Sequence, residues 1–203
     1  MSIESLADLY VEELKDLYSA ENQILKALPK MIDAATHPEL KKAFSGHLAQ
    51  TKIHVERLET ICEDLGVSPK GKKCKGMEGV IADGAELIED EPESNVLDAG
   101  LASAAQHVEH YEMAGYGSVR TWAEQLGYGS HVKLLQQTLD EEKSADKLLT
   151  QIAERSLNID AVVGDMVEEG LADVSSRAQR SASKSTKSQT SRHRGSEDVA
   201  ESR

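Results

Sequence analysis

Residues 17–25, "LYSAENQIL", place a charged side chain on the face of a helix that should be buried. Leu17, Ile24 and Leu25 are apolar and have helical spacing, and Glu21 falls among them. A carboxylate without a partner is costly in an apolar interior. The stretch therefore predicts a helix whose buried charge is compensated by groups from elsewhere in the chain.

The composition of the 203-residue chain is typical of one helical domain with an appendage. Aromatic residues make up 3% of the chain, and only four prolines occur. Leu, Ala, Glu and Lys favour helices over strands. No apolar run approaches the ~20 residues that span a membrane, and the N-terminus lacks a signal-peptide pattern. We expect a cytoplasmic protein without a membrane segment, in which Cys62 and Cys74 are reduced thiols.

Charge is distributed unevenly along the chain. The net charge is −13, yet residues 177–203 contain seven Lys or Arg and three Asp or Glu. The remainder is strongly acidic, which disfavours binding of nucleic acid and favours cations. Residues 177–194 contain six basic and no acidic residues. A solvated tail is the favoured interpretation of this segment, and contact with nucleic acid through it is the alternative.

Apolar residues at helical spacing predict a first pair of long helices. The first covers about residues 5–35, and the second begins near "THPEL" and covers about residues 36–65. Thr36 is its predicted cap, because a Glu follows three residues later. Gly66 follows the last residue of the apolar pattern, as glycine commonly does at the end of a helix.

A second pair of helices is predicted over residues 94–126 and 130–157, joined by the tight link "GYGS". A glycine-weakened short helix near residues 74–90 interrupts the long connection between the pairs. Two short links and one long crossover are typical of an all-α, ferritin-like four-helix bundle. The predicted organisation is a bundle over residues 1–158, a short accessory helix over 159–175 and a disordered, basic, Ser-rich tail over 176–203.

Each long helix has polar residues on its buried face near mid-length, and antiparallel packing brings these to one level. Two divalent cations would neutralise about four carboxylates, as in di-iron and di-manganese bundles. Oxygen-rich sites with one or two imidazoles suit iron or manganese better than zinc. His47 is expected to lie beside the ligands rather than among them. The predicted ligands, for one or two Fe or Mn ions, are Glu21, Gln50, His54, Glu109, Glu112, Glu142 and Asp146.

Several segments resemble one known family, the YciE/YciF-type ferritin-like stress proteins, over roughly residues 4–157. They are "DLYSAENQILKALPKM", "HLAQTKIHVERLE", "KKCKGMEGVI", "AAQHVEHYEMAGYGS" and "LLQQTLDEEKSADKLL". The resemblance implies a ferritin-like bundle, a homodimer and a link to bacterial stress responses. Carried onto this chain, the family's acidic positions fall on Glu21, Glu109, Glu112, Glu142 and Asp146.

The second helix departs from the family's pattern. Where the family commonly shows "HLEET", this chain has "HLAQT" at residues 47–51, so Gln50 replaces a glutamate. His54 stands where the family commonly has glutamine. A neutral amide is a weaker ligand for a hard cation than a carboxylate. His54 would restore a ligand, but with one negative charge fewer.

Three functions follow from these patterns. The first is a metal-binding stress protein that acts on Fe(II), peroxide or oxygen, as a possible di-metal oxidase or peroxide-detoxifying enzyme. The second is a non-enzymatic structural or interaction protein, whose metal-free polar core specifies the bundle. The third is a nucleic-acid-associated protein that uses residues 177–194. A large iron-storage shell is disfavoured, because nothing in the sequence identifies a shell-forming interface.

Overall fold

The computed structural model describes residues 3–164, and every regular element among them is helical. Residues Met1–Ala161 form one compact unit, and Val162–Arg203, which lie almost wholly outside the described residues, form a second. The elements are α1 (Leu6–Ala34), α2 (Pro38–Asp64), α3 (Lys75–Glu89), α4 (Ser94–Gln125), α5 (Gly129–Ile152) and a π-helical turn η1 (Ala153–Leu157).

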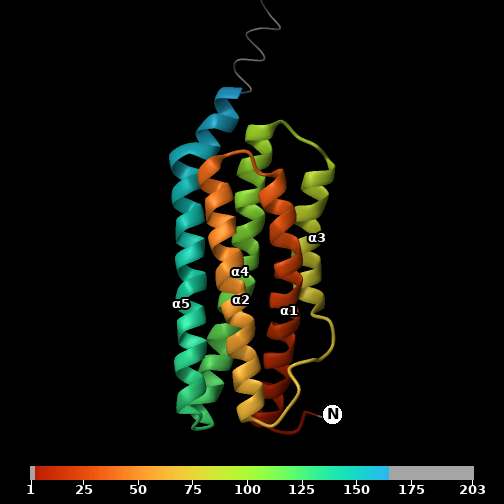
Figure 1. Cartoon of the computed structure of the whole chain (residues 1–203), viewed down its shortest axis with the longest axis vertical. Coiled ribbons are helices and arrows are strands. Elements are labelled where there is room, and N and C mark those ends of the chain that lie inside the picture. The colour runs from red at the N-terminus through yellow and green to blue at the C-terminus, as the bar shows by residue number, and fades with distance from the viewer. Residues whose placement is uncertain (1–2, 165–203) are drawn as a thin grey trace, which may run out of the picture. The chain divides into compact units, whose positions relative to one another are not determined.

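The four long helices α1, α2, α4 and α5 run side by side as a bundle (Figure 1). Short links make α1 antiparallel to α2 and α4 antiparallel to α5, whereas the connection that contains α3 crosses the length of the bundle. This crossover helix packs against α1 and α4. The structure thus confirms the predicted all-α bundle with one long crossover and a short helix within it.

Glycine ends two of the long helices as the sequence predicts. At the end of α2, Gly66 has a φ of +68°, and its N–H donates to the carbonyl of Glu63 at 2.9 Å. The next amide, that of Val67, donates to the carbonyl of Cys62 at 3.0 Å. Gly127 repeats this pattern after α4, with a φ of +80°. Left-handed glycines allow the last carbonyls of both helices to be satisfied.

The predicted cap of α2 is wrong. His37, not Thr36, is the N-cap residue, and no side chain caps this helix. Thr36 instead donates from its backbone N–H and its hydroxyl to the carboxylate of Asp98 in α4, at 2.8 and 2.5 Å. The backbone N–H of His37 donates to the same carboxylate at 2.8 Å. A partner far away in the sequence therefore fixes the link between α1 and α2 onto α4.

Two apolar clusters fill the bundle, one toward each end. One contains Ile24, Phe44, Leu101 and Leu149, and the other contains Leu14, Leu58, Val119 and Leu135. On α2, for example, Leu40 and Phe44 of one cluster precede the polar positions, and Leu58 and Ile61 of the other follow them. On α1, Glu21 lies where the residues of one cluster give way to those of the other. The core is therefore interrupted by one polar layer.

A close approach of α1 and α4 adjoins this polar layer. Gly115 in α4 is buried, and a Cβ added to it would lie 2.7 Å from Cδ2 of Leu17 in α1. Real Cβ atoms are not found so close to a neighbouring carbon, so an alanine here would force the side chain of Leu17 to move. The glycine places Glu112 and Tyr116, one turn before and one residue after it, against α1.

The C-terminal part of the bundle departs from a regular α-helix at η1, a π-helical turn that the sequence analysis did not predict. The chain is helical again over residues 158–164, which overlap the start of the predicted accessory helix. The rest of that helix and the predicted tail, including residues 177–194, lie outside the described residues. Within residues 3–164 no helix combines the length and apolarity that crossing a membrane requires.

We expect Asp98→Ala to destabilise the bundle, because it removes the buried carboxylate that accepts three hydrogen bonds from Thr36 and His37. Losing hydrogen bonds to a charged group costs about 1.5–3 kcal/mol, which should appear as a loss of unfolding free energy in urea titrations. Asp83→Ala, at an exposed position of α3, is the control. Equal stability of the two variants would show that Asp98 does not anchor the α1–α2 link.

Candidate metal centre

Six buried side chains with oxygen or nitrogen donors meet in the polar layer. They form two groups whose donor atoms lie within 4.8 Å of one another, and both groups include Glu142. The helices α1, α2, α4 and α5 all contribute, because each has polar residues in place of apolar ones on its buried face near mid-length. The six residues, each at most 7% exposed, are Glu21, His47, His54, Glu109, Glu112 and Glu142.

The first group joins α1, α2 and α5. Nδ1 of His54 lies 3.3 Å from Oε1 of Glu21 and 2.9 Å from Oε1 of Glu142. None of the three residues is measurably exposed to solvent. Tyr116 of α4 donates a hydrogen bond to the same oxygen of Glu21. The second oxygen of Glu21, Oε2, has no hydrogen-bond partner.

The second group joins α2, α4 and α5. Nε2 of His47 lies 3.4 Å from Oε1 of Glu109 and 3.9 Å from Oε2 of Glu142. Glu112, one turn along α4 from Glu109, completes the group. Both oxygens of Glu112 are buried and lack hydrogen-bond partners. Because Glu142 offers one oxygen to each group, the two groups are continuous.

Most of the donor atoms in this layer have no hydrogen bond. Nδ1 of His54 and Oε1 of Glu142 are 2.9 Å apart, but their orientation is not that of a hydrogen bond. Among the described residues, only Nδ1 of His37 and Nε of Arg120 are buried side-chain atoms without partners outside the six. Buried polar atoms are nearly always paired, so this concentration of unpaired atoms leaves the layer able to hold a metal ion.

Within residues 3–164, no lysine or arginine neutralises the four carboxylates. Among the described residues, none of the ion pairs joins Glu21, Glu109, Glu112 or Glu142 to a Lys or Arg. Burial raises the pKa of Glu21, and it raises the pKa values of Glu109 and Glu112 well above the usual range, with neighbouring carboxylates adding to the effect. In the absence of a cation, part of this charge is therefore removed by protonation.

The two histidines respond to this environment in opposite directions. Burial lowers the pKa of His47. Burial also opposes the charge of His54, but contacts with Glu142 and Glu21 outweigh it and raise the pKa of His54 to about 10. Although burial works against ionisation of Glu142, its contacts with His54 and Glu109 hold its pKa below the usual value. The metal-free layer therefore contains an internal His54–Glu142 ion pair.

Glu141 orients His54, a role that the sequence analysis did not predict. Its Oε2 lies 2.8 Å from Nε2 of His54, and it also accepts two hydrogen bonds from Arg57, at 2.6 and 3.0 Å. A proton on Nε2 therefore points at Glu141, and Nδ1 faces the carboxylates. Carboxylates commonly orient a ligand histidine in this way. The spacing of apolar residues on α5 did not identify Glu141, because Glu141 lies off the buried face of the helix that contains Glu142.

The structure brings together five of the seven predicted ligands and leaves Asp146 outside both groups. Gln106 donates to Asp146 at 3.0 Å, and Nε2 of His110 is 3.3 Å away from it. Gln50 is half-buried on α2, one turn before His54, and its part in the site stays a prediction. His47, which we expected beside the ligands, is a member of the second group. Its position on the buried stripe of α2, two turns before His54, was a signal in the sequence.

The fold and the polar layer define a four-helix bundle with a buried carboxylate–histidine centre, the architecture of ferritin-like proteins. A family model for DUF892, a domain of unknown function, matches residues 5–162. The chain therefore belongs to the DUF892 family, and the resemblance noted in the sequence is confirmed.

The most similar relatives include protein YciF of Escherichia coli K12, which is 42% identical over 159 residues, or 78% of this chain and 96% of YciF. The crystal structure of YciF, an E. coli stress protein, matches with a TM-score of 0.74 and covers 77% of this chain and 99% of that one. YcfI of Rhodopseudomonas palustris, a proposed structural protein, matches with a TM-score of 0.72 at 41% identity, over 73% and 95% of the chains. This chain is thus a YciF-type stress-protein relative.

We expect the two histidines of the metal-free protein to titrate on opposite sides of neutrality. His47 should lose its proton below pH 6.5, whereas His54 should remain charged up to a pKa of about 10. Because this pKa is higher than in the unfolded chain, His54 stabilises the fold fully below about pH 6.5, and this contribution is lost as the pH rises toward 10. Histidine ring resonances followed by NMR against pH measure both values. A His54 that titrates near 6.5 would contradict the ion pair with Glu142.

Proposed function

We propose that this protein is a ferritin-like metal-binding stress protein that holds one or two iron or manganese ions in the polar layer. The observation that supports it is the group of unpaired donor atoms on Glu21, His47, His54, Glu109, Glu112 and Glu142. Protonation of Glu109 or Glu112 would remove part of the charge and let these carboxyls donate to Glu142 and Glu21. A cation would balance the carboxylates without protonation and would also occupy the unpaired nitrogen of each histidine that faces them.

The donor set fits a hard or borderline divalent metal. Each group combines carboxylate oxygens with one imidazole, and neither includes a thiolate, since Cys62 and Cys74 pack in the apolar clusters. Glu21 and His54 would hold one ion, His47, Glu109 and Glu112 a second, and Glu142 would contribute to both. Two divalent cations would balance four carboxylates.

Iron or manganese, when bound here, would supply one-electron redox chemistry toward a small oxidant such as peroxide or oxygen. The chain's own residues would provide the setting for it. The apolar clusters on both sides of the layer exclude bulk water and strengthen electrostatic interactions inside it. Tyr116 keeps one oxygen of Glu21 engaged, and Glu141 together with Arg57 holds the ring of His54 in place.

A metal-free polar core is the second candidate, and the raised pKa values of Glu109 and Glu112 favour it. If these carboxyls are neutral, the layer loses two of its four charges and can specify the register of the bundle without a metal. This candidate makes the opposite prediction for substitutions. Glu21→Leu should stabilise the bundle, and Fe(II) or Mn(II) should leave the melting temperature unchanged.

The expected homodimer and the cytoplasmic location belong to the same proposal. The dimer is implied by the family resemblance, and the location by the two cysteines, which are free and buried. A reduced compartment would keep both thiols intact and would supply Fe(II) or Mn(II).

We expect the wild-type chain, loaded anaerobically with Fe(II) or Mn(II), to retain one to two metal ions per chain by elemental mass spectrometry. The Glu21→Ala/Glu142→Ala variant should retain almost none, because Glu142 serves both groups. A ligand present at 100 times its Kd adds about 2.7 kcal/mol to stability, so the wild-type melting temperature should also rise.

The matched control is Glu56→Ala/Glu154→Ala, which removes two exposed glutamates and leaves the layer intact. Circular dichroism would show that both variants fold. The proposal fails if folded wild type retains no metal, or if the site variant retains as much as the control.

Metal affinity should rise with pH. Bound carboxylates and imidazoles must be deprotonated, so Glu109, Glu112 and His54 release protons when a cation enters. Isothermal titration calorimetry with Mn(II), in two buffers that differ in ionisation enthalpy, would count these protons. We expect net release near neutral pH and tighter binding at pH 8 than at pH 6. An affinity that does not change with pH would contradict this picture.

A further inference from the structure

A second feature of the bundle is an apolar chamber of about 790 Å³, half open to solvent, on one side of the polar layer. All five α-helices contribute to its wall. Small-molecule sites in proteins typically enclose 300–1,000 Å³ and are mostly apolar with a few polar groups. The chamber fits this description, and the function proposed above does not use it.

The wall of the chamber is largely hydrocarbon. Ile24, Leu28, Phe44, Val108, Leu149 and Ile152 belong to one apolar cluster and face this space. The crossover helix α3 contributes Ile81 and Ile88, which are only half-buried, so it covers the chamber without filling it.

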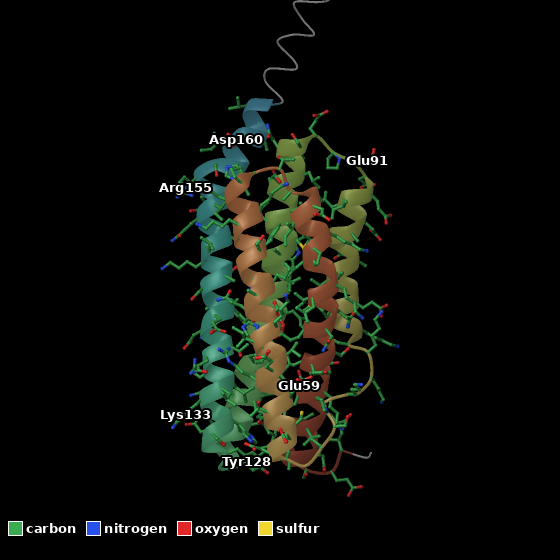
Figure 2. The ribbon with its side chains drawn as sticks, viewed as in Figure 1. Glu59, Glu91, Tyr128, Lys133, Arg155 and Asp160 are labelled. Atoms are coloured by element: carbon green, nitrogen blue, oxygen red, sulfur yellow. The ribbon has the colours of Figure 1, made fainter. Side chains whose placement is uncertain are left out.

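The chamber is elongated along the bundle. Its wall includes residues 39 to 50 on α2, residues 144 to 152 on α5 and Arg155 in η1. At 1.5 Å per residue, the range on α2 corresponds to ~16 Å along the helix axis. One end reaches the polar layer at His47 and Glu109. The other end reaches the level of Glu39 and Arg155, at the end of α5 (Figure 2).

The exposed charges that line the chamber are predominantly positive. Lys73 pairs with Glu78, and Arg155 pairs with Glu39. Lys26, Lys30 and Lys42 are exposed and have no ion pair within the described part of the chain. Three unpaired cations around one apolar space stand out in a chain whose net charge is −13.

We propose that the chamber binds one long-chain carboxylate, with its hydrocarbon chain inside and its anionic head at Lys26, Lys30 and Lys42. The length and the apolar wall of the chamber match a long hydrocarbon chain. The three lysines, called the rim below, match the carboxylate head. Burying the chain supplies affinity in proportion to the apolar area removed from water. The lysines favour an acid over a neutral lipid of the same length. This inference goes beyond the metal centre and does not depend on it.

The experiment uses the full-length protein, freed of metal with EDTA, and palmitate as the probe. Displacement of a fluorescent fatty acid, checked by calorimetry, measures affinity and stoichiometry. We expect one palmitate per chain and no binding of butyrate. Ala85→Phe, which adds a ring to a half-buried wall position of α3, should weaken palmitate at least about tenfold, or ~1.4 kcal/mol. Ala49→Phe, exposed and outside the wall, should leave binding unchanged.

The rim is tested separately by charge removal. Lys26→Gln/Lys30→Gln/Lys42→Gln should weaken palmitate several-fold and leave hexadecanol unaffected. Lys52→Gln/Lys133→Gln removes exposed lysines outside the wall and should change neither ligand. Lys133 lies near the end of α5 opposite to Arg155 (Figure 2).

The proposal is overturned if wild type binds neither palmitate nor dodecanoate, or if Ala85→Phe, still folded by circular dichroism, binds as tightly as Ala49→Phe. Equal loss of acid and alcohol in the rim variant would also overturn it. The Glu21→Ala/Glu142→Ala variant should bind palmitate normally, because neither residue lines the chamber. Failure of the metal proposal and failure of this one therefore give different results.

Discussion

The need to compensate four buried carboxylates governs the middle of this bundle. Glu21, Glu109, Glu112 and Glu142 meet between two apolar clusters, and no lysine or arginine of residues 3–164 forms an ion pair with them. In so buried a layer their mutual repulsion is far stronger than at a surface. The fold can persist with this arrangement only if protons or cations offset the charge. This constraint gives one physical reason for the histidine contacts, the unpaired donor atoms and the family relationship.

Much of the fold and part of the centre could be predicted from the sequence, because both depend on local periodicity. The stripe through Leu17, Glu21 and Ile24 identified α1 and also placed Glu21 inside it. The same helical spacing predicted that Glu112 and Glu142 face the interior. The lengths of the links between helices predicted the ferritin-like topology. Gly66 and Gly127 marked helix ends, because only glycine adopts their left-handed conformation readily.

The remaining features depend on contacts between residues far apart in the sequence. Thr36 has the local pattern of a cap, yet Asp98 of α4 takes both of its donors. Asp146 has helical spacing from Glu142, but it meets Gln106 and His110 instead of the buried carboxylates. Glu141 is adjacent to Glu142 in the sequence, but its carboxylate contacts Nε2 of His54 on α2. The chamber could not be predicted either, because it results from how α3 seats on the bundle.

A crystal soaked in Mn(II) and measured at a wavelength where manganese scatters anomalously would test the central claim most directly. The account predicts anomalous density within the polar layer, with Glu142 at or between the peaks and Asp146 uninvolved. A layer without anomalous density, in crystals that show manganese bound at their surface, would contradict it. The carboxylates would then be compensated by protons, and the centre would be a structural feature of the bundle.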